Sequence, residues 1–122
     1  MFSLNLRSRT AIYEQIIEQI EGFVVSGVLK ENDSLPSVRS LAVELAINPN
    51  TAARAYGELE RRGIVTTVVG RGTVIAQGAA KLILKRMTEK EFKEVVTKYF
   101  HAGVEREVLV NIIDKVYEEA EK

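Results

Sequence analysis

Two helical segments separated by almost no chain are the feature that most constrains this sequence. Residues 38–46 carry apolar side chains at helical spacing, and so do residues 49–62. Only Ile47 and Asn48 remain between them, and a link this short forces the two helices to cross steeply. The pattern predicts a helix-turn-helix. Its predicted inward faces consist of Val38, Leu41, Ala42, Leu45, Ala52, Ala53, Tyr56 and Leu59.

Residues that favour helix ends support these boundaries. Ser37 follows a proline and is expected to cap the first helix of the pair. Asn48 is expected to cap the second, with Pro49 at the first helical position, where its missing N–H costs nothing. Gly63 is expected to end that helix. We therefore expect the pair to be defined by local sequence.

Another helix is predicted before the pair, and a hairpin after it. Apolar residues recur at helical spacing over residues 12–24, with Thr10 as the expected cap and Gly27 as the expected C-terminal stop. Residues 2–6 alternate and predict a short strand or an extended arm. Residues 64–69 and 73–75 are rich in β-branched side chains, and Gly70-Arg71-Gly72 joins them as a hairpin with the arginine at its tip.

The fold class is therefore mainly α with a small β-hairpin wing. Residues 1–76 are expected to form a winged helix-turn-helix DNA-binding domain, and residues 77–122 a short all-helical C-terminal dimerisation region. In this tail we expect a break at Thr88, capped with Glu91, a stop at Gly103, and a last helix that already carries Val104.

The composition argues against catalysis and against bound metals. The chain has no cysteine and a single histidine, His101, which lies near a helix end and is expected at the surface. No phosphate loop or nucleophile motif is present. We expect no enzymatic activity and no cofactor. No apolar run has the length of a membrane span or of a signal-peptide core, so we expect no membrane association and a cytoplasmic location.

In a helix-turn-helix, the second helix lies in the DNA major groove with its N-terminal residues facing the bases. Asn50 and Thr51 occupy that position, and their backbone amides are expected to be open to a phosphate. Arg54 is expected to contact a guanine or a phosphate, and Arg39 the flanking backbone. Arg71 is expected to enter the minor groove.

Several segments of the chain resemble the GntR family of bacterial and archaeal transcription regulators over about Ile12 to Ala76. The matching segments are Gly27–Arg39, Leu41–Thr51, Arg54–Glu60, Gly63–Val65 and Gly70–Thr73. The short helical tail is similar to that of the YtrA subfamily, whereas other members carry larger effector domains.

The resemblance implies a dimeric repressor that binds double-stranded DNA. It implies contacts from Arg39, Asn50, Thr51, Arg54, Arg71, Gly72 and Thr73, and Ser37 is a further candidate for a phosphate contact. The family commonly has basic residues just before the wing glycine, where this chain has Val68 and Val69. That departure argues against strong anchoring by the wing and leaves more of the binding to the recognition helix.

The tail also predicts a homodimer. Two helices alone bury little apolar surface, yet the last one has a wide apolar stripe. Packing on a second copy resolves this and gives a two-fold interface matched to a palindrome-like operator. The tail is expected to be too small for an effector pocket of the usual size, about 300 Å³ or more, unless one forms between protomers. The sequence assigns no effector.

The main alternative is a winged helix used as a protein-interaction module without specific DNA binding. The net charge of +0 and the valines before the wing glycine favour it, because DNA-binding domains usually carry a basic excess. The segment Ser34–Val74 is nevertheless basic, with five arginines against three glutamates. The salt dependence of DNA binding separates the two hypotheses.

Overall fold

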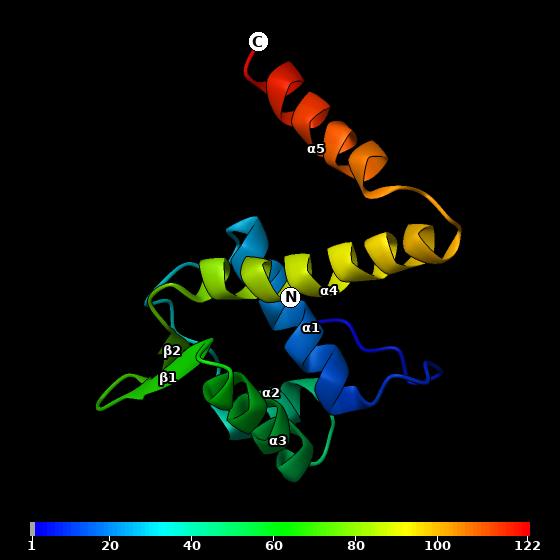
Figure 1. Ribbon diagram of the computed structural model, residues 1–122. Helices are drawn as coiled ribbons and strands as arrows, with labels where there is room; N and C mark the ends of the chain where they lie inside the picture. The colour runs from blue at the N-terminus through cyan, green and yellow to red at the C-terminus, as the bar shows by residue number, and fades with distance from the viewer. Residues whose placement is uncertain (1) are drawn as a thin grey trace. The chain divides into compact units, whose positions relative to one another are not determined.

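The computed structural model describes residues 2–122, which form two compact units, one ending at Leu84 and the other spanning Lys85–Lys122. The elements within these residues are α1 (Ile12–Ser26), α2 (Val38–Leu45), α3 (Pro49–Arg61), β1 (Val65–Val68), β2 (Gly72–Ile75), α4 (Ala79–His101) and α5 (Arg106–Ala120) (Figure 1). Three helices followed by a hairpin confirm the predicted winged helix, with further helices after it.

The core of the first unit lies between α1, α2, α3 and the base of the hairpin. Its large, fully buried side chains include Ile16, Ile20, Leu41, Leu59 and Ile64. Ala79 and Ile83, from the beginning of α4, are also fully buried in this cluster. The start of α4 is therefore part of the first unit.

Two predicted caps of the helix pair are present. The Ser37 hydroxyl accepts the Ser40 N–H at 3.0 Å, and the Asn48 side chain accepts the Asn50 N–H at 2.8 Å. Gly27 ends α1 with a φ of 84°, which glycine adopts without a Cβ clash. These boundaries depend only on residues within a few positions, so the sequence was sufficient to predict them.

The predicted cap of α1 is wrong. The N-cap residue is Ala11 and no side chain caps this end. Thr10 instead offers its backbone carbonyl to the Gln15 side chain at 2.9 Å. Gln15 also pairs with the backbone N–H and carbonyl of Asn5 at 2.8 and 2.9 Å. This buried glutamine ties Asn5 and Thr10 to α1. No strand forms within residues 2–10, and residues 6–10 form turns and bends.

The predicted inward face of α3 contained one error. Ala52, Ala55, Tyr56 and Leu59 are buried, whereas Ala53 is exposed. The buried set follows the i, i+3, i+4, i+7 spacing of one helix face, and Ala53 lies outside it. Sequence spacing alone did not distinguish two neighbouring alanines, and the packing of α1 and α2 on α3 decided between them.

The predicted break at Thr88 is also wrong, because α4 continues from Ala79 to His101. A capping motif begins a new helix only where the preceding helix has already ended. No glycine or proline interrupts this segment, so the helix continues through Thr88. Gly103, with a φ of 84°, does stop the helix as predicted. Val104 precedes α5, which begins at Arg106, so its predicted place inside the last helix is wrong.

Candidate nucleic-acid interface

The turn between α2 and α3 is closed by backbone hydrogen bonds. Ala46 adopts a left-handed conformation, with a φ of 54°, and its N–H points back to the carbonyls of Ala42 and Val43. The Ile47 N–H donates to the Ala42 carbonyl at 3.0 Å. Asn48 then begins α3 directly. This compact turn fixes α3 relative to α2.

Tyr56 provides a second tie within the helix pair. Its hydroxyl donates to the Pro36 carbonyl at 2.7 Å and so joins α3 to the residues just before α2. Burial of the ring, and then the nearby Glu44 carboxylate, raise the pKa of Tyr56 to about 12. Tyr56 is therefore neutral at physiological pH and donates this bond throughout that range.

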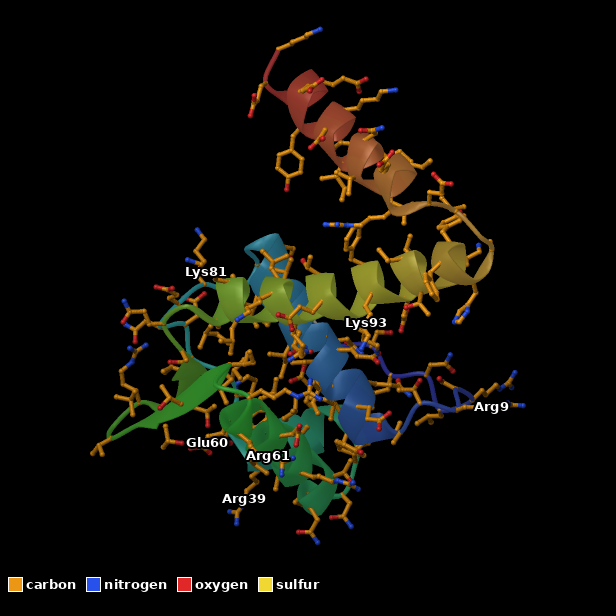
Figure 2. All side chains as sticks on the ribbon, viewed as in Figure 1. Arg9, Arg39, Glu60, Arg61, Lys81 and Lys93 are labelled. Atoms are coloured by element: carbon orange, nitrogen blue, oxygen red, sulfur yellow. The ribbon has the colours of Figure 1, made fainter. Side chains whose placement is uncertain are left out.

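Polar side chains gather at the exposed N-terminal half of α3. Asn50 and Arg54 are exposed and Thr51 is half-buried. Within residues 2–122, none of these side chains makes a hydrogen bond or an ion pair. Their donors and acceptors are therefore available to another molecule. Arg39 of α2 shares this property and extends outward from the helix pair (Figure 2). We call Arg39, Asn50, Thr51 and Arg54 the recognition surface.

The backbone amides at this helix end are not open, contrary to the prediction. The Asn50 N–H donates to the Asn48 side chain, and the Thr51 N–H donates to the Asn48 carbonyl at 3.0 Å. Pro49 has no N–H. Because Asn48 caps the helix so completely, contacts from this helix end must come from side chains.

Arg54 lies against an aromatic ring of another helix. Its guanidinium carbon is 3.8 Å from the centroid of the Tyr13 ring, which belongs to the first turn of α1. Tyr13 is half-buried against the core, and its hydroxyl donates to the Glu14 carboxylate at 3.1 Å. Tyr13 was not predicted to belong to this surface, because helical spacing marks it only as one of the apolar residues of α1.

The wing consists of β1, the loop Val69–Arg71 and β2. The strands pair antiparallel, with Val65 opposite Ile75 and Val68 opposite Gly72. Gly70 and Gly72 have φ values of 83° and 79°, which other residues rarely adopt. Val69 is completely exposed. Thr73 is half-buried and its carbonyl accepts the Leu35 N–H at 2.8 Å.

Arg71 does not extend freely from the wing. Its two terminal nitrogens donate to the Asn32 side chain at 2.8 Å, the Asn32 carbonyl at 2.7 Å and the Ser34 hydroxyl at 3.3 Å. Ser34 also forms an antiparallel bridge with Val74. Arg71 therefore anchors the wing to the loop before α2, and its Nε–H and one Nη1–H are left without a partner within residues 2–122.

The arginine pair at the end of α3 is already neutralised. Arg61 is mostly exposed and forms an ion pair with Glu58. Arg62 is half-buried and bonds to Glu58 at 3.0 Å and to the buried Glu21 of α1 at 3.3 Å. Arg62 therefore links α3 to α1 and is not a freely solvated charge.

The second unit presents an apolar surface. An open groove of about 440 Å³ is lined by side chains of α4, the linker and α5, among them Phe92, Tyr99, Val108 and Ile112. Every α5 residue remains at least partly exposed, and Val116 and Tyr117 are exposed by 58% and 68%. This volume is larger than the pocket of about 300 Å³ for which the tail was expected to be too small. The groove forms between α4 and α5 of a single chain.

Residues 2–122 contain neither a metal-binding cluster nor a membrane-spanning helix. No group of three or more histidine, aspartate or glutamate side chains in this range is arranged to hold a metal ion. None of the helices described is both long and apolar enough to cross a membrane. His101, at the end of α4, is exposed and stacks edge-on against Phe100, as expected for a surface residue.

Comparison with known proteins places this geometry in a family. The profile described as "Bacterial regulatory proteins, gntR family" matches residues 12–75. The HTH-type transcriptional repressor YtrA of Bacillus subtilis (strain 168) is 41% identical over 119 residues, which cover 95% of this chain and 92% of that protein.

Solved structures extend the similarity to the whole chain. The structure of YtrA from Sulfolobus acidocaldarius, a GntR-family transcription factor, matches with a TM-score of 0.61 and 27% identity, covering 99% of this chain and 100% of that one. The DNA-binding domain of AraR in complex with operator ORR3 matches with a TM-score of 0.50 and 26% identity, covering 62% of this chain and 93% of that one.

Proposed function

Because this chain belongs to the gntR family of bacterial regulatory proteins, we propose that it is a homodimeric repressor that binds a palindrome-like operator. It is a DNA-binding transcriptional regulator of the YtrA type and not an enzyme. The observation that carries the proposal is the recognition surface, whose side chains are exposed or half-exposed and unpaired within residues 2–122. We place its action in the cytoplasm, where promoter DNA is accessible.

The residues of the recognition surface contact two parts of the DNA, the base edges and the phosphate backbone. Asn50, Thr51 and Arg54 face the major groove, since a helix-turn-helix inserts this part of its second helix. Arg54 forks onto a guanine edge, for which its guanidinium is well shaped. Arg39 binds the flanking phosphates, and Ser37 lies beside it, with a hydroxyl that already serves the α2 cap.

The wing makes a smaller contact. Arg71, Gly72 and Thr73 approach the neighbouring minor groove, with Arg71 using the Nε–H that its bonds to Asn32 and Ser34 leave available. Valines stand before the glycine, so few charges reach DNA from the wing. The recognition helix therefore supplies most of the affinity.

Binding to the promoter duplex upstream of the protein's own gene tests the proposal. Fluorescence anisotropy at two salt concentrations, with a scrambled duplex alongside, should show promoter-preferring binding that weakens steeply with salt, because phosphate contacts release counterions. Arg54→Ala should cost about 1–3 kcal/mol at the promoter. The control is Arg61→Ala, which removes the same charge from the same helix but from a residue paired with Glu58.

Each outcome of this experiment has a distinct meaning. Unchanged affinity in Arg54→Ala would remove that residue from the base-reading set. Equal, weak binding to both duplexes would contradict a sequence-specific repressor. A flat or absent salt response would favour the alternative function, a winged helix that binds proteins, to which the net charge of +0 points.

The proposed dimer uses the C-terminal helices. The groove of about 440 Å³ and the exposed apolar side chains of α5 leave much apolar surface in water for a chain of this size. A second copy covers this surface through a two-fold interface, which places two recognition helices about one DNA turn apart. The dimer thereby matches a palindrome-like operator.

A charge placed in this apolar surface tests the dimer. Ile112, which lines the groove, is changed to lysine, and the control Asn111→Lys adds the same charge at an exposed polar position of α5. Sedimentation should show a dimer for the unaltered protein and the control but a monomer for Ile112→Lys, since burying an unpaired ammonium is costly. Equal masses for all three proteins would contradict the proposed interface.

A further inference from the structure

We propose that Tyr13 is a positioning residue of the recognition surface, which holds the guanidinium of Arg54 in the orientation that contacts DNA. The inference rests on the proposed contact between Arg54 and a base. The inference goes beyond that contact, because it assigns part of the DNA affinity to a residue of α1, outside the helix-turn-helix pair.

The geometry of the pair carries the inference. The guanidinium carbon of Arg54 lies 3.8 Å from the Tyr13 ring centroid, which is contact distance over the face of the ring. Arg54 has no hydrogen bond or ion pair within residues 2–122, so this ring is the contact that restrains it. A guanidinium that stacks through its flat face leaves the N–H donors along its edge unused. These are the donors that form the bidentate contact with a guanine.

The ring itself is well fixed. Tyr13 belongs to the first turn of α1 and packs against the core, so it is tied to the same rigid unit as α3. Arg54 is a long side chain that must lose its freedom when it binds a base. Because the ring removes part of that freedom in advance, DNA binding costs less. A cation–π contact at an exposed site changes an equilibrium by roughly 2–5-fold, which sets the expected effect.

A direct contact of Tyr13 with DNA is disfavoured by its surroundings. The hydroxyl donates to the Glu14 carboxylate at 3.1 Å, and this exposed negative charge repels a phosphate. Tyr13 therefore acts through its ring face. This distinction makes different predictions for two substitutions: Tyr13→Phe keeps the ring and removes the hydroxyl, whereas Tyr13→Leu keeps an apolar side chain and removes the ring.

The first measurement uses the full-length protein without DNA. In the NMR spectrum, the Nε–H proton of Arg54 should be shifted upfield by the ring current of Tyr13. The shift should persist in Tyr13→Phe and vanish in Tyr13→Leu. An Arg54 signal that is the same in all three proteins would overturn the proposal, and this readout does not depend on whether the protein is a repressor.

The second measurement is a double-mutant cycle on the upstream promoter duplex and on the same duplex with its guanines substituted. Tyr13→Leu should weaken promoter binding roughly 2–5-fold and reduce discrimination between the duplexes, while Tyr13→Phe binds as the unaltered protein does. In an Arg54→Ala background, Tyr13→Leu should have no further effect.

Other results would count against the positioning role. An equal loss from Tyr13→Leu with and without Arg54 would show that the ring acts independently, and weak binding by Tyr13→Phe would indicate a direct hydroxyl contact. If Arg54→Ala alone leaves promoter binding unchanged, the proposed base contact fails instead. Thermal unfolding of each variant, followed by circular dichroism, separates loss of folding from loss of binding.

Discussion

Replacing Tyr56 by phenylalanine tests the tie that orients the recognition helix. The ring is 5% exposed and the hydroxyl donates to the Pro36 carbonyl at 2.7 Å. Phenylalanine keeps the packing of the ring and removes only this bond. At neutral pH we expect Tyr56→Phe to lower the free energy of unfolding by about 1 kcal/mol, the usual net contribution of one hydrogen bond.

The pH dependence of this difference has a definite sign. The pKa of Tyr56 rises from 10.0 to about 12 on folding, so the folded state holds the proton more tightly than the unfolded chain. The resulting stabilisation is complete below about pH 10 and is lost as the pH rises toward 12. Its total is about 3 kcal/mol, because each pKa unit corresponds to about 1.4 kcal/mol.

These two magnitudes predict a crossover. At about pH 11, one unit above the pKa of the unfolded state, the unaltered protein has lost about 1.4 kcal/mol of its free energy of unfolding. The phenylalanine variant has no such loss, because it has no hydroxyl to titrate. The variant should therefore match or exceed it in stability at that pH, although it is weaker at neutral pH. Groups other than Tyr56 titrate equally in both proteins and cancel in the difference.

Urea unfolding of both proteins, followed by helical circular dichroism at one protein concentration and several pH values, measures this difference. A difference that stays constant from neutral pH to about pH 11 would refute the reasoning, because it would mean that Tyr56 titrates alike in the folded and unfolded states. A more stable variant at neutral pH would refute the hydrogen-bond argument.

Three further predictions concern the packing of the first unit. Ile83→Ala should lower the free energy of unfolding by about 2–5 kcal/mol, because this side chain of α4 is fully buried; a loss under about 1 kcal/mol in urea unfolding would show that α4 is not part of the core. Gly27→Ala should cost about 1 kcal/mol in the same assay, although nothing surrounds the added Cβ, because the φ of 84° is unfavourable for alanine; an unchanged midpoint would contradict this. Arg71→Lys keeps the charge but loses the paired hydrogen bonds to Asn32 and Ser34. The Leu35 amide, which donates to the Thr73 carbonyl, should then exchange its hydrogen faster. Unchanged protection of this amide would show that Arg71 does not anchor the wing.

The sequence was sufficient for the features that depend on near neighbours. Ser37 and Asn48 each form their cap with a residue two or three positions away, and Gly27 ends its helix through its own backbone. The hairpin likewise pairs adjacent segments. Such contacts are encoded within a few residues, so reading the chain locally predicts them. The predicted break at Thr88 is wrong for a related reason. The capping motif is a local signal, and the helix-forming residues on both sides of it favour a continuous helix.

Tertiary structure decided which side chains of the candidate site are available. Asn32 and Ser34 bind Arg71, and Arg54 rests on Tyr13. Both contacts join residues far apart in the chain. Their partners are set by how α1 and the loop before α2 pack against the helix pair and the wing, and no spacing within a segment carries that information. The sequence by itself determined the order of the elements and the residue types on the recognition helix. Only the packing of these elements decided which of those residues are left unpaired, because an exposed arginine binds whichever acceptor or ring the fold brings within its reach.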